Sequence, residues 1–536
     1  MRAQPMNAAY DIAVVGSGFA GSLMAMIARR LGRSVVLIEK GSHPRVVIGE
    51  SSTPLANLLL EDLCERYELP AIRSLAKWGP WQRTHPQLAC GLKRGFTFHH
   101  HVLNRPQSFD LERRNQLLVA ASPHDQIADT HWYRADFDSF LVNQAQELGV
   151  DYLDRVTLQS FQQRGKEIQL SGARHGKPVD FRARFVIDAT GPRGLLYRAL
   201  GLAEAPLPDY PGTQSLYSHF SGVDRLSGTM HSRTDEEPPY PIDAAAVHHV
   251  FAGGWAWVLH FNNGITSAGV AATDTFAAQL RLADGAPAWQ RLIEHIPALQ
   301  SQFAAARTEQ PFSYLPRLSF RSAAIAGERW ALLPSSAGFV DPLLSTGFPL
   351  TLLGVARLAA IIERDWNSGS FGAQLEVYAT QTDEELLAAA QLIGALYANM
   401  DNFDVFAALT LLYFAAVSFS ESARRLGKPQ LAPSFLLCTH PEFGPACQRL
   451  CARAWRKLTA NESRELIAEI LAVIEPINVA GLGKPERRNW YPVDADDLLN
   501  AAAKLNASRE EIMALIERCG FHTAPITDSV PMTFLP

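Results

Sequence analysis

The sequence predicts an α/β fold in which a parallel sheet carries an inserted antiparallel sheet and is followed by a C-terminal helical cap. Residues 10–41 run in the order strand, glycine-rich turn, helix, strand, which is the pattern of a βαβ unit. Short runs rich in aromatic and β-branched residues fill 214–273 and are typical of antiparallel strands. Beyond about residue 365, Leu/Ala-rich helical patterns dominate.

The length and composition favour one large body. Of the 536 residues, 47% are hydrophobic and 19% are charged, so the chain is too long for one small module and too apolar to be disordered. We expect residues 1–365 to form the main body, with the inserted sheet at about 210–275, and residues 366–536 to form the mainly helical C-terminal region. The most apolar stretch, 405–420, is shorter than the ~20 residues of a spanning helix, so we expect a buried core helix.

Charge and cysteine content exclude several classes of partner. The net charge is −5, and the basic residues are scattered, so no nucleic-acid partner is expected. The six cysteines form no disulfide framework, and Cys447 and Cys451 lack the second pair of a zinc site. The histidines at 99–101 are consecutive strand residues that point to opposite faces, so we expect no metal.

Residues 1–10 lack a signal-like apolar run. We therefore expect a cytoplasmic protein without stable membrane insertion.

The first βαβ unit carries a phosphate-binding pattern. Gly16, Gly18 and Gly21 form GxGxxG between a strand and a helix, where glycines let backbone N–H groups approach a pyrophosphate at the helix N-terminus. Glu39 ends the second strand, where a carboxylate can accept hydrogen bonds from a ribose hydroxyl. The parallel sheet is therefore predicted to bind a dinucleotide, and the spacing alone leaves NAD and FAD open.

Further elements of the body follow in order. A helix at 137–148 leads into a strand-like alternation at 156–160, and the buried strand RFVID at 184–188 ends in the turn ATGPRG. The inserted antiparallel sheet is predicted to form the substrate wall. A strand at 330–333, the loop SSAGFVDPLLSTGFP and a helix at about 350–364 close the nucleotide-binding body.

Three more segments decide between the two dinucleotides. They are Gly49 and Ser51 in HPRVVIGESSTP, Arg134 in WYRADFDSFL, and Asp188 at the start of DATGP. Their order and spacing resemble the two-dinucleotide-binding flavoproteins that include aromatic hydroxylases and flavin-dependent halogenases. The resemblance implies FAD, with Gly49 and Ser51 near the flavin, Arg134 on the phosphate side and Asp188 near the dinucleotide loop.

Two motifs then narrow the resemblance to flavin-dependent halogenases acting on pyrroles or phenols, over about 10–365. GWAWVL at 254–259 resembles their WxWxIP signature, which implies that Trp255 and Trp257 belong to the substrate pocket. GFVDPLLSTG at 338–347 resembles their halide loop, which implies that Asp341 contacts FAD and that Thr346 and Gly347 bind halide. The tryptophans also admit a purely structural reading as core packing on one strand face.

A third segment, CGLKRGFTFH at 90–99, resembles the one that carries the active-site lysine of these enzymes, and this implies that Lys93 is catalytic. A buried lysine amine can hold a hypohalous acid and direct it to the substrate. The alternatives are a surface lysine at a strand end and a rival, Lys77, in a helical pattern without a motif. Glu50 is either a buried acid or a hydrogen-bond acceptor for a turn.

Two positions depart from the family pattern. His260 stands where WxWxIP ends in proline, and Leu344 occupies the position of the acidic residue of tryptophan halogenases. The second departure fits the phenol and pyrrole branch. We place His260 in the substrate pocket, where a titratable imidazole can alter the separation of substrate from flavin.

The predicted function is FADH2-dependent halogenation of an electron-rich pyrrole or phenol through a flavin hydroperoxide and hypohalous acid. The halide is chloride or bromide, and the small aromatic substrate is free or carrier-bound. No second GxGxxG is present, so the resemblance implies a separate flavin reductase and a role in antibiotic biosynthesis or other secondary metabolism. The alternatives are an FAD-dependent aromatic hydroxylase (a monooxygenase) and a flavin-binding protein without turnover.

Overall fold

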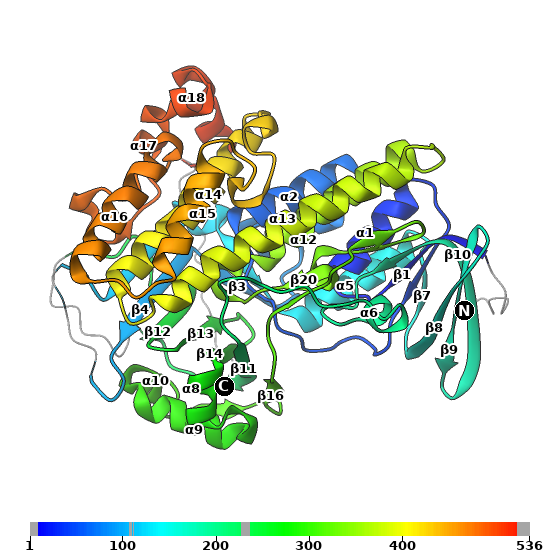
Figure 1. Cartoon of the computed structure of the whole chain (residues 1–536), viewed down its shortest axis with the longest axis horizontal. Coiled ribbons are helices and arrows are strands. Elements are labelled where there is room, and N and C mark those ends of the chain that lie inside the picture. Colours follow the sequence, from blue (N-terminus) through cyan, green and yellow to red (C-terminus); the bar gives the residue numbers. More distant parts are fainter. Residues whose placement is uncertain (1–8, 107–109, 111, 227–235, 522–536) are drawn as a thin grey trace.

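A twisted parallel sheet forms one half of the molecule, on the right in Figure 1. The computed structural model describes residues 9–106, 110, 112–226 and 236–521. Five parallel strands lie in the order β19-β10-β1-β2-β7. Their bounds are β1 (Ala9–Val15), β2 (Val35–Ile38), β7 (Asp151–Leu153), β10 (Lys177–Asp188) and β19 (Trp330–Leu332). The hairpin β8 (Val156–Arg164) and β9 (Glu167–Arg174) extends β10, and β18 (Ala326–Gly327) is antiparallel to β19.

The predicted βαβ unit is formed by β1, α1 (Phe19–Arg30) and β2. The last four of the seven residues of β1 and all four residues of β2 are buried. Helices cover both faces of the parallel sheet, so its strands are apolar on both faces. Helix α1 ends with Arg29 and Arg30, whose charges oppose the negative end of the helix dipole. This unit places the glycine-rich turn at the carboxyl edge of the sheet, where ligands bind in open α/β folds.

The second sheet is mainly antiparallel, and it contains more strands than the predicted insertion at 210–275 supplies. Its strands lie in the order β15-β11-β14-β13-β12-β4-β5-β21, with β16 beside β11. Two strands come from earlier in the chain and one from the C-terminal region. Strand β4 is parallel to β12 and antiparallel to β5, and β21 is parallel to β5. The bounds are β4 (Gly95–His101), β5 (Gln116–Ala120), β11 (Thr213–Ser221), β12 (Ala246–Phe251), β13 (Gly254–His260), β14 (Ile265–Thr273), β15 (Arg307–Thr308), β16 (Ser313–Leu315) and β21 (Trp490–Tyr491).

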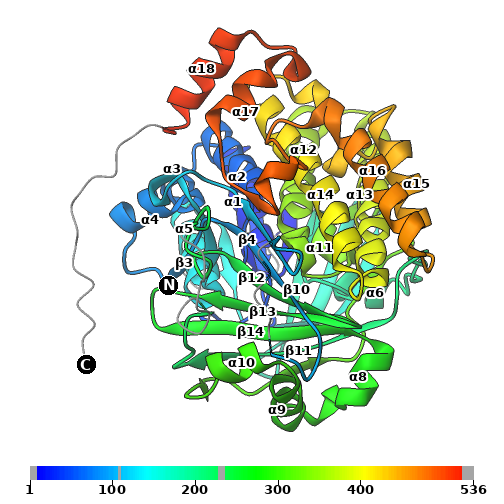
Figure 2. The same ribbon diagram turned by 90° about the vertical axis from the view of Figure 1, so that its left-hand side faces the viewer.

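Helices cover both faces of this second sheet (Figure 2). On one face, α8 (Asp274–Leu280), α9 (Ala286–His295) and α10 (Pro297–Gln302) share an apolar core with the sheet. On the other face lie α12 (Gly347–Asp365), α13 (Phe371–Ala398) and α14 (Phe403–Arg425). Alternate side chains of β13 therefore face two different cores, which decides where its motif residues point.

The C-terminal region is helical, as predicted, and packs on the body. Its remaining helices are α15 (Phe443–Ala454), α16 (Ala460–Ile474), α17 (Ala495–Asn500) and α18 (Arg509–Arg518). Two segments, Leu343–Asp365 and Phe403–Arg425, are long and apolar enough to cross a membrane, but their apolar windows are 72% and 89% buried inside the protein. Helix α14 contains the stretch 405–420 and is a buried core helix.

The other elements support the loops of the site. Helix α5 begins at Arg134, three residues before the expected start. The remaining helices and strands are α2 (Pro54–Arg66), α3 (Pro70–Arg73), α4 (Trp78–Thr84), α5 (Arg134–Glu147), α6 (Leu195–Ala199), α11 (Pro334–Ala337), β3 (Cys90–Lys93), β6 (Asp129–Trp132), β17 (Phe320–Arg321) and β20 (Gly338–Phe339). The strands pair as β3 with β6 and β17 with β20.

Candidate active site

A cavity of about 510 Å³ runs from the glycine-rich turn to the second sheet. Its walls are the start of α1, the loop 45–51, the turn 189–193, the segment 338–348 and the strands β12 and β13. We call it the first cavity. Ten of the residues singled out in the sequence line it: Gly18, Gly21, Gly49, Ser51, Arg134, Trp255, Trp257, Asp341, Thr346 and Gly347.

The glycines of the turn have two different roles. Gly16 has φ +100°, and a Cβ there or at Gly21 would overlap the backbone of Ala189 or of Gly16 itself. These two glycines let β1, α1 and the end of β10 approach closely. Gly18 has an ordinary φ of −66°, and its Cβ would lie 3.6 Å from Arg134 Nη2 and 3.9 Å from Arg45 Nη2. Gly18 therefore keeps space open in front of two guanidinium groups.

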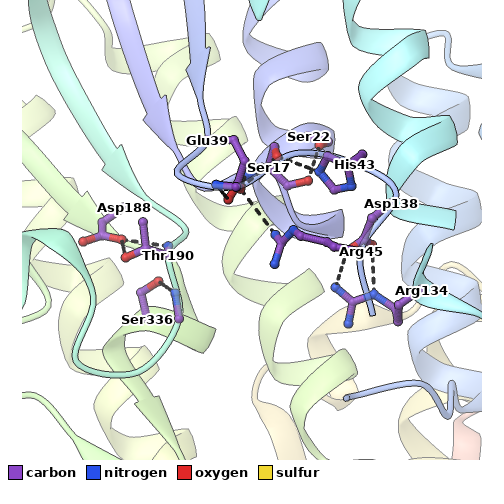
Figure 3. A network of polar contacts seen from close by, with 12 residues as sticks. Ser17, Ser22, Glu39, His43, Arg45, Arg134, Asp138, Asp188, Thr190 and Ser336 are labelled. Atoms are coloured by element: carbon purple, nitrogen blue, oxygen red, sulfur yellow. Dashed lines mark hydrogen bonds and ion pairs between the residues drawn. The ribbon is translucent and has the colours of Figure 1, made fainter. Parts of the chain in front are cut away.

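The start of α1 fits an anionic group. Among the described residues no side chain caps its free N–H groups, and its first turn holds no acid. Arg45 and Arg134 approach the same point (Figure 3). Arg134 is held by both oxygens of Asp138 at 2.8 and 2.7 Å and donates to Gly49 O at 2.8 Å. Helix N–H groups and two cations are the donor set that a pyrophosphate requires.

Glu39 lies behind this turn. Its carboxylate accepts from Ser17 N and Ser17 Oγ, both at 2.9 Å, from Gly41 N at 2.8 Å and from Arg45 Nη2 at 3.3 Å. Burial favours a raised pKa, but the charge of Arg45 and these hydrogen bonds outweigh it, and the pKa of Glu39 lies below its usual value. Glu39 is therefore an anion that fixes Arg45 at the cavity.

Asp188 also lies behind the cavity wall. Its side chain accepts from Thr190 N and Thr190 Oγ1 at 2.8 and 2.6 Å and from Leu196 N at 2.7 Å. Gly191 N in turn donates to Ser336 Oγ at 2.9 Å (Figure 3). Asp188 thus shapes the turn 189–193, which forms the wall opposite Arg45.

Asp341 anchors the segment 338–348. Its carboxylate accepts from Tyr397 OH at 2.8 Å, from Trp255 Nε1 at 3.2 Å, from Tyr210 OH at 3.2 Å and from Leu343 N at 2.9 Å. Burial raises the pKa of Asp341 to about 6. These bonds tie the segment to β13 and α13 and hold the start of α12 against the cavity.

Helix α12 begins at this wall. Leu344 and Ser345 have φ values of +61° and +54°, so the chain turns sharply before Thr346 and Gly347. Among the described residues no side chain caps α12, and no described atom lies within 4 Å of a Cβ at Gly347. The first N–H groups of α12 are thus available to a small anion in the first cavity.

Lys93 is fully buried. It ends β3 opposite Asp129 of β6, and its Nζ donates to Ser51 Oγ at 2.8 Å and to Ser52 O at 2.5 Å. The ammonium also lies 3.7 Å from the centre of the Phe96 ring. Burial lowers the pKa of Lys93 to about 7. The alternative of a surface lysine does not fit this position.

A second cavity of about 180 Å³ lies on the other side of Lys93. Its walls come from α2, β4, β5, α14 and the C-terminal residues 479–521, and they include Thr53, Phe96, Lys77, Tyr413 and Phe414. Ser51, which accepts from Lys93, lines the first cavity, whereas Phe96, under the ammonium, lines the second. Lys93 itself lines neither cavity among the described residues, but its ammonium lies between Ser51 on the wall of the first cavity and Phe96 on the wall of the second.

The two tryptophans face the first cavity. Their ring centres are 5.6 Å apart; Trp255 is tied to Asp341, and Trp257 Nε1 donates to Ser267 Oγ at 3.3 Å. Leu259 lines the same cavity. Residues 255, 257 and 259 thus share one face of β13, on the FAD-side wall rather than in the second cavity.

His260 lies on the opposite face of β13, with Ala256 and Val258. His260 is absent from the described residues that line either cavity. Its Nδ1 is 3.0 Å from Thr266 Oγ1, and its Nε2 is 3.9 Å from Asp243 Oδ1. Burial, followed by the charge of Arg225, lowers the pKa of His260 to about 4.

The orientation of His260 away from both cavities determines the effect expected of His260→Pro, the substitution that restores the proline of the WxWxIP motif. His260→Pro is expected to leave the ratio of halogenated to hydroxylated product unchanged, because the side chain does not reach the route between the cavities. It should lower the melting temperature by a few degrees, since the Thr266 contact and strand packing are lost. Product analysis by mass spectrometry and a thermal melt measure both effects. A shift from hydroxylated to halogenated product would contradict this placement.

Sequence reasoning did not identify Asp129 and Tyr413 as site residues. Asp129 was hidden because its partners lie far along the chain, and Tyr413 because it sits in an apolar helix. Arg45 lies in the segment HPRVVIGESSTP, for which no role of this arginine was predicted; its spacing of six residues from Glu39, with which it pairs, is the one signal that could have indicated it. Among the described residues, no group of three or more His, Cys, Asp or Glu side chains is arranged to hold a metal.

The fold and first cavity define a dinucleotide-binding oxidoreductase. Residues 11–322 match the family model of FAD-dependent oxidoreductases, and the chain belongs to this family. FAD is therefore the dinucleotide that the glycine-rich turn and the two arginines fit.

Relatives confirm the resemblance to flavin-dependent halogenases. Tetracycline 7-halogenase from Kitasatospora aureofaciens is 28% identical over 385 residues, covering 70% of this chain and 68% of the relative. Monodechloroaminopyrrolnitrin halogenase PrnC from Pseudomonas fluorescens is 28% identical over 392 residues, covering 70% of this chain and 66% of the relative. The chain thus spans about two thirds of the length of these two relatives.

Solved structures confirm the α/β fold class. The crystal structure of halogenase PltM in complex with phloroglucinol and FAD superposes with a TM-score of 0.78 at 23% identity, covering 89% of this chain and 99% of that one. Flavin-dependent brominase Bmp2 has a TM-score of 0.56 at 20% identity, covering 87% and 99%. The arrangement of parallel sheet, second sheet and helical region is therefore shared with flavin halogenases.

Proposed function

We propose that this protein is an FADH2-dependent halogenase of an electron-rich aromatic compound, a pyrrole or a phenol. The observation that carries the proposal is the place of Lys93, which is buried between the first cavity and the smaller second cavity, whose lining includes several aromatic side chains. Such an arrangement separates the aromatic substrate from the flavin, so that only a small oxidant passes. A hydroxylase instead needs its substrate beside the flavin.

Each cavity then has a distinct task. In the first, Arg45, Arg134 and the start of α1 bind the FAD pyrophosphate, and the N–H groups of Thr346 and Gly347 bind chloride or bromide. Bound reduced FAD and O2 supply the oxidising power that converts halide into hypohalous acid. Lys93 receives this acid at its Nζ and directs it to the second cavity. There Phe96, Tyr413 and Phe414 hold the aromatic ring.

The partners follow from the same arrangement. The described chain offers one glycine-rich dinucleotide turn, so reduced FAD is supplied by a separate flavin reductase. The substrate is a small aromatic molecule, free or attached to a carrier, as the relative named 1H-pyrrole-2-carbonyl-[peptidyl-carrier protein] chlorinase illustrates for its own reaction. We assign the protein to the cytoplasm, to secondary metabolism such as antibiotic biosynthesis, and to no nucleic-acid partner.

A direct assay tests the function. The protein is incubated with FAD, a flavin reductase, NADH and bromide or chloride, together with a panel of phenols, pyrroles and indoles. Mass spectrometry is expected to show the halogen isotope pattern in a phenol or pyrrole product. Hydroxylated product that forms equally well without halide would instead identify a monooxygenase. Binding of FAD without any product from the panel would favour a flavin protein without turnover.

The halide site is tested separately with Gly347→Ala. The added methyl group meets no described atom within 4 Å, so it extends into the cavity where we place the anion. We expect the bromide concentration for half-maximal product to rise by about 10-fold, the equivalent of about 1.4 kcal/mol. Gly372→Ala in α13 is the matched control, because its Cβ is equally free. An unchanged bromide requirement in Gly347→Ala would place the halide elsewhere.

A further inference from the structure

A single buried carboxylate stands between the two lysines that the sequence left as rivals. Asp129 has no exposed surface and lies opposite Lys93 in the β3–β6 pair. Its Oδ1 accepts from Lys77 Nζ at 3.1 Å and from Asn57 Nδ2 at 2.8 Å. Its Oδ2 has no hydrogen-bond partner among the residues that the structure describes. One negative charge is thus shared by two cations.

The two lysines occupy different places. Lys77 precedes α4 and lines the second cavity, while the Lys93 ammonium lies between the second cavity and the first. Lys77 pairs directly with Asp129 at 3.1 Å, and Lys93 is the residue opposite Asp129 in the strand pair. Because like charges repel and one carboxylate faces both cations, we expect the charge on Lys77 to weaken the attraction of Asp129 for Lys93. The protonation of Lys93 therefore depends on both neighbours.

We propose that Asp129 is a positioning residue that keeps Lys93 in its ammonium form between the cavities, and that Lys77 moderates this effect by pairing with the same carboxylate. This inference rests on the proposed function, which assigns the reacting lysine to Lys93. Asp129 and Lys93 line neither cavity among the described residues, but the Lys93 ammonium contacts Ser51 and Phe96 on the two cavity walls. We therefore expect Asp129 to act through the lysines and not on the substrate.

The ammonium form has a definite use in the reaction. The aromatic carbon attacks the halogen of hypohalous acid, a C–X bond forms, and the X–O bond breaks with its electron pair on oxygen. A proton from Lys93 Nζ converts this oxygen to water. The ring then loses its proton to the neutral Lys93 amine, which restores both the aromatic ring and the ammonium. An unprotonated lysine at the start would leave hydroxide as the leaving group.

Other groups near the lysines do not titrate in the same range. Burial lowers the pKa of His131 well below its usual value and that of His248 to about 3, and burial raises the pKa of Tyr413. Lys77 is further surrounded by Arg425, Glu61 and Glu421. Burial alone lowers the pKa of Lys93, and Asp129 is the charge that raises it again. Lys93 is therefore the group whose titration reports on Asp129.

The experiment measures this titration directly. The protein is labelled with [ε-13C]lysine, FAD is added, and the Lys93 signal, assigned by its loss in Lys93→Arg, is followed by NMR against pH. Asp129→Asn is expected to lower the titration midpoint by at least one pH unit, a 10-fold change in acid dissociation. Lys77→Met is expected to raise it, because the competing cation is gone. Asp125→Asn, which removes a carboxylate paired with the neighbouring Arg94, is the control and should leave it unchanged.

Opposite shifts in the two variants support the proposal, since a merely structural role for Asp129 predicts none. Equal midpoints, or shifts in the same direction, overturn it. If Asp129→Asn does not fold, Lys77→Met decides alone: a raised midpoint supports the proposal, and an unchanged or lowered one overturns it.

Product formation separates this inference from the function on which it rests. In a halogenating protein, Asp129→Asn should lose about 8-fold or more in product per FADH2 oxidised at pH 7.5, because the ammonium fraction falls by that factor when the midpoint drops one unit from about 7. It should recover most of this loss at pH 6, with flavin oxidation unchanged. If the parent protein gives no halogenated product while the titration midpoints of Lys93 shift as expected, the proposed function is wrong but the effect of Asp129 and Lys77 on Lys93 is confirmed. If the parent halogenates and the midpoints do not move, the inference fails alone.

Discussion

Lys93→Met is expected to abolish halogenated product while FAD binding and the oxidation of FADH2 continue. Lys93 does not line the first cavity among the described residues and reaches its wall by the hydrogen bond to Ser51, so its removal is expected to leave the FAD site in place. It also removes the proton donor that we propose between the cavities, and such donors contribute roughly 10²–10⁴-fold to rate. The measurement is the amount of halogenated product per FADH2 oxidised, with free hypohalous acid trapped by a dye.

A thermal melt provides the control for folding. The pKa of Lys93 is about 7 in the folded protein against about 10.5 when exposed, so burying the ammonium costs stability fully below pH 7, and this cost disappears as the pH rises from 7 to 10.5. Lys93→Met should therefore be at least as stable as the parent at pH 6. Loss of FAD from the variant would show a structural role, and an unchanged product yield would return the role to Lys77.

Gly18→Val is expected to raise the dissociation constant of FAD by at least ~100-fold, about 2.7 kcal/mol. The backbone at Gly18 is ordinary, and the nearest atoms to a Cβ are the guanidinium nitrogens of Arg134 and Arg45, so the side chain fits the fold but fills the place of the pyrophosphate. Fluorescence titration with FAD measures the change.

The choice of Gly18 matters for the interpretation. A side chain at Gly21 would overlap Gly16 O, so a variant there would lose folding together with FAD. Gly369→Val is a suitable control, because Gly369 is exposed and no described atom lies within 4 Å of its Cβ. If Gly18→Val still binds FAD as tightly as the parent, the dinucleotide does not cross the start of α1.

The sequence was most informative where contacts are local. Gly16, Gly18 and Gly21 lie within six residues, and Glu39 ends the next strand, so turn chemistry and strand periodicity were enough to predict the βαβ unit. Arg134 and Asp138 stand four residues apart on one helix. Such patterns are fixed by geometry within a single element or between neighbouring elements.

Long-range pairings explain what the sequence did not reveal. Strand β4 joins the second sheet through β12, about 150 residues later, and β21 joins through β5. The separate β3–β6 pair and the Lys93–Ser51 hydrogen bond bring together Ser51, Lys93 and Asp129, none of which has a local reason to meet the others. The second cavity additionally needs α14 and the residues after it, which show only helical periodicity in the sequence.

His260 shows that a motif match and strand periodicity can point in different directions. The match to WxWxIP placed it with the two tryptophans, but a residue three positions after Trp257 lies on the other strand face. The alternation of side chains along the strand could be read from the sequence, and it determines the orientation of His260. Ala256 and Val258, on the same face of β13 as His260, pack in the core shared with α8–α10.

The two cavities are encoded by different stretches of chain. Among the described residues, the last one that lines the first cavity is Leu386, whereas more than half of the lining of the second cavity comes from residues 413–521. On the proposed division of tasks, substitutions confined to 413–521 are expected to change which aromatic molecule is accepted and to leave formation of the oxidant intact. Chimaeras that join the first 400 residues of this chain to the tail of another enzyme of the same architecture would then give new halogenation patterns, and the same division would allow products to diversify in evolution without change to the flavin site.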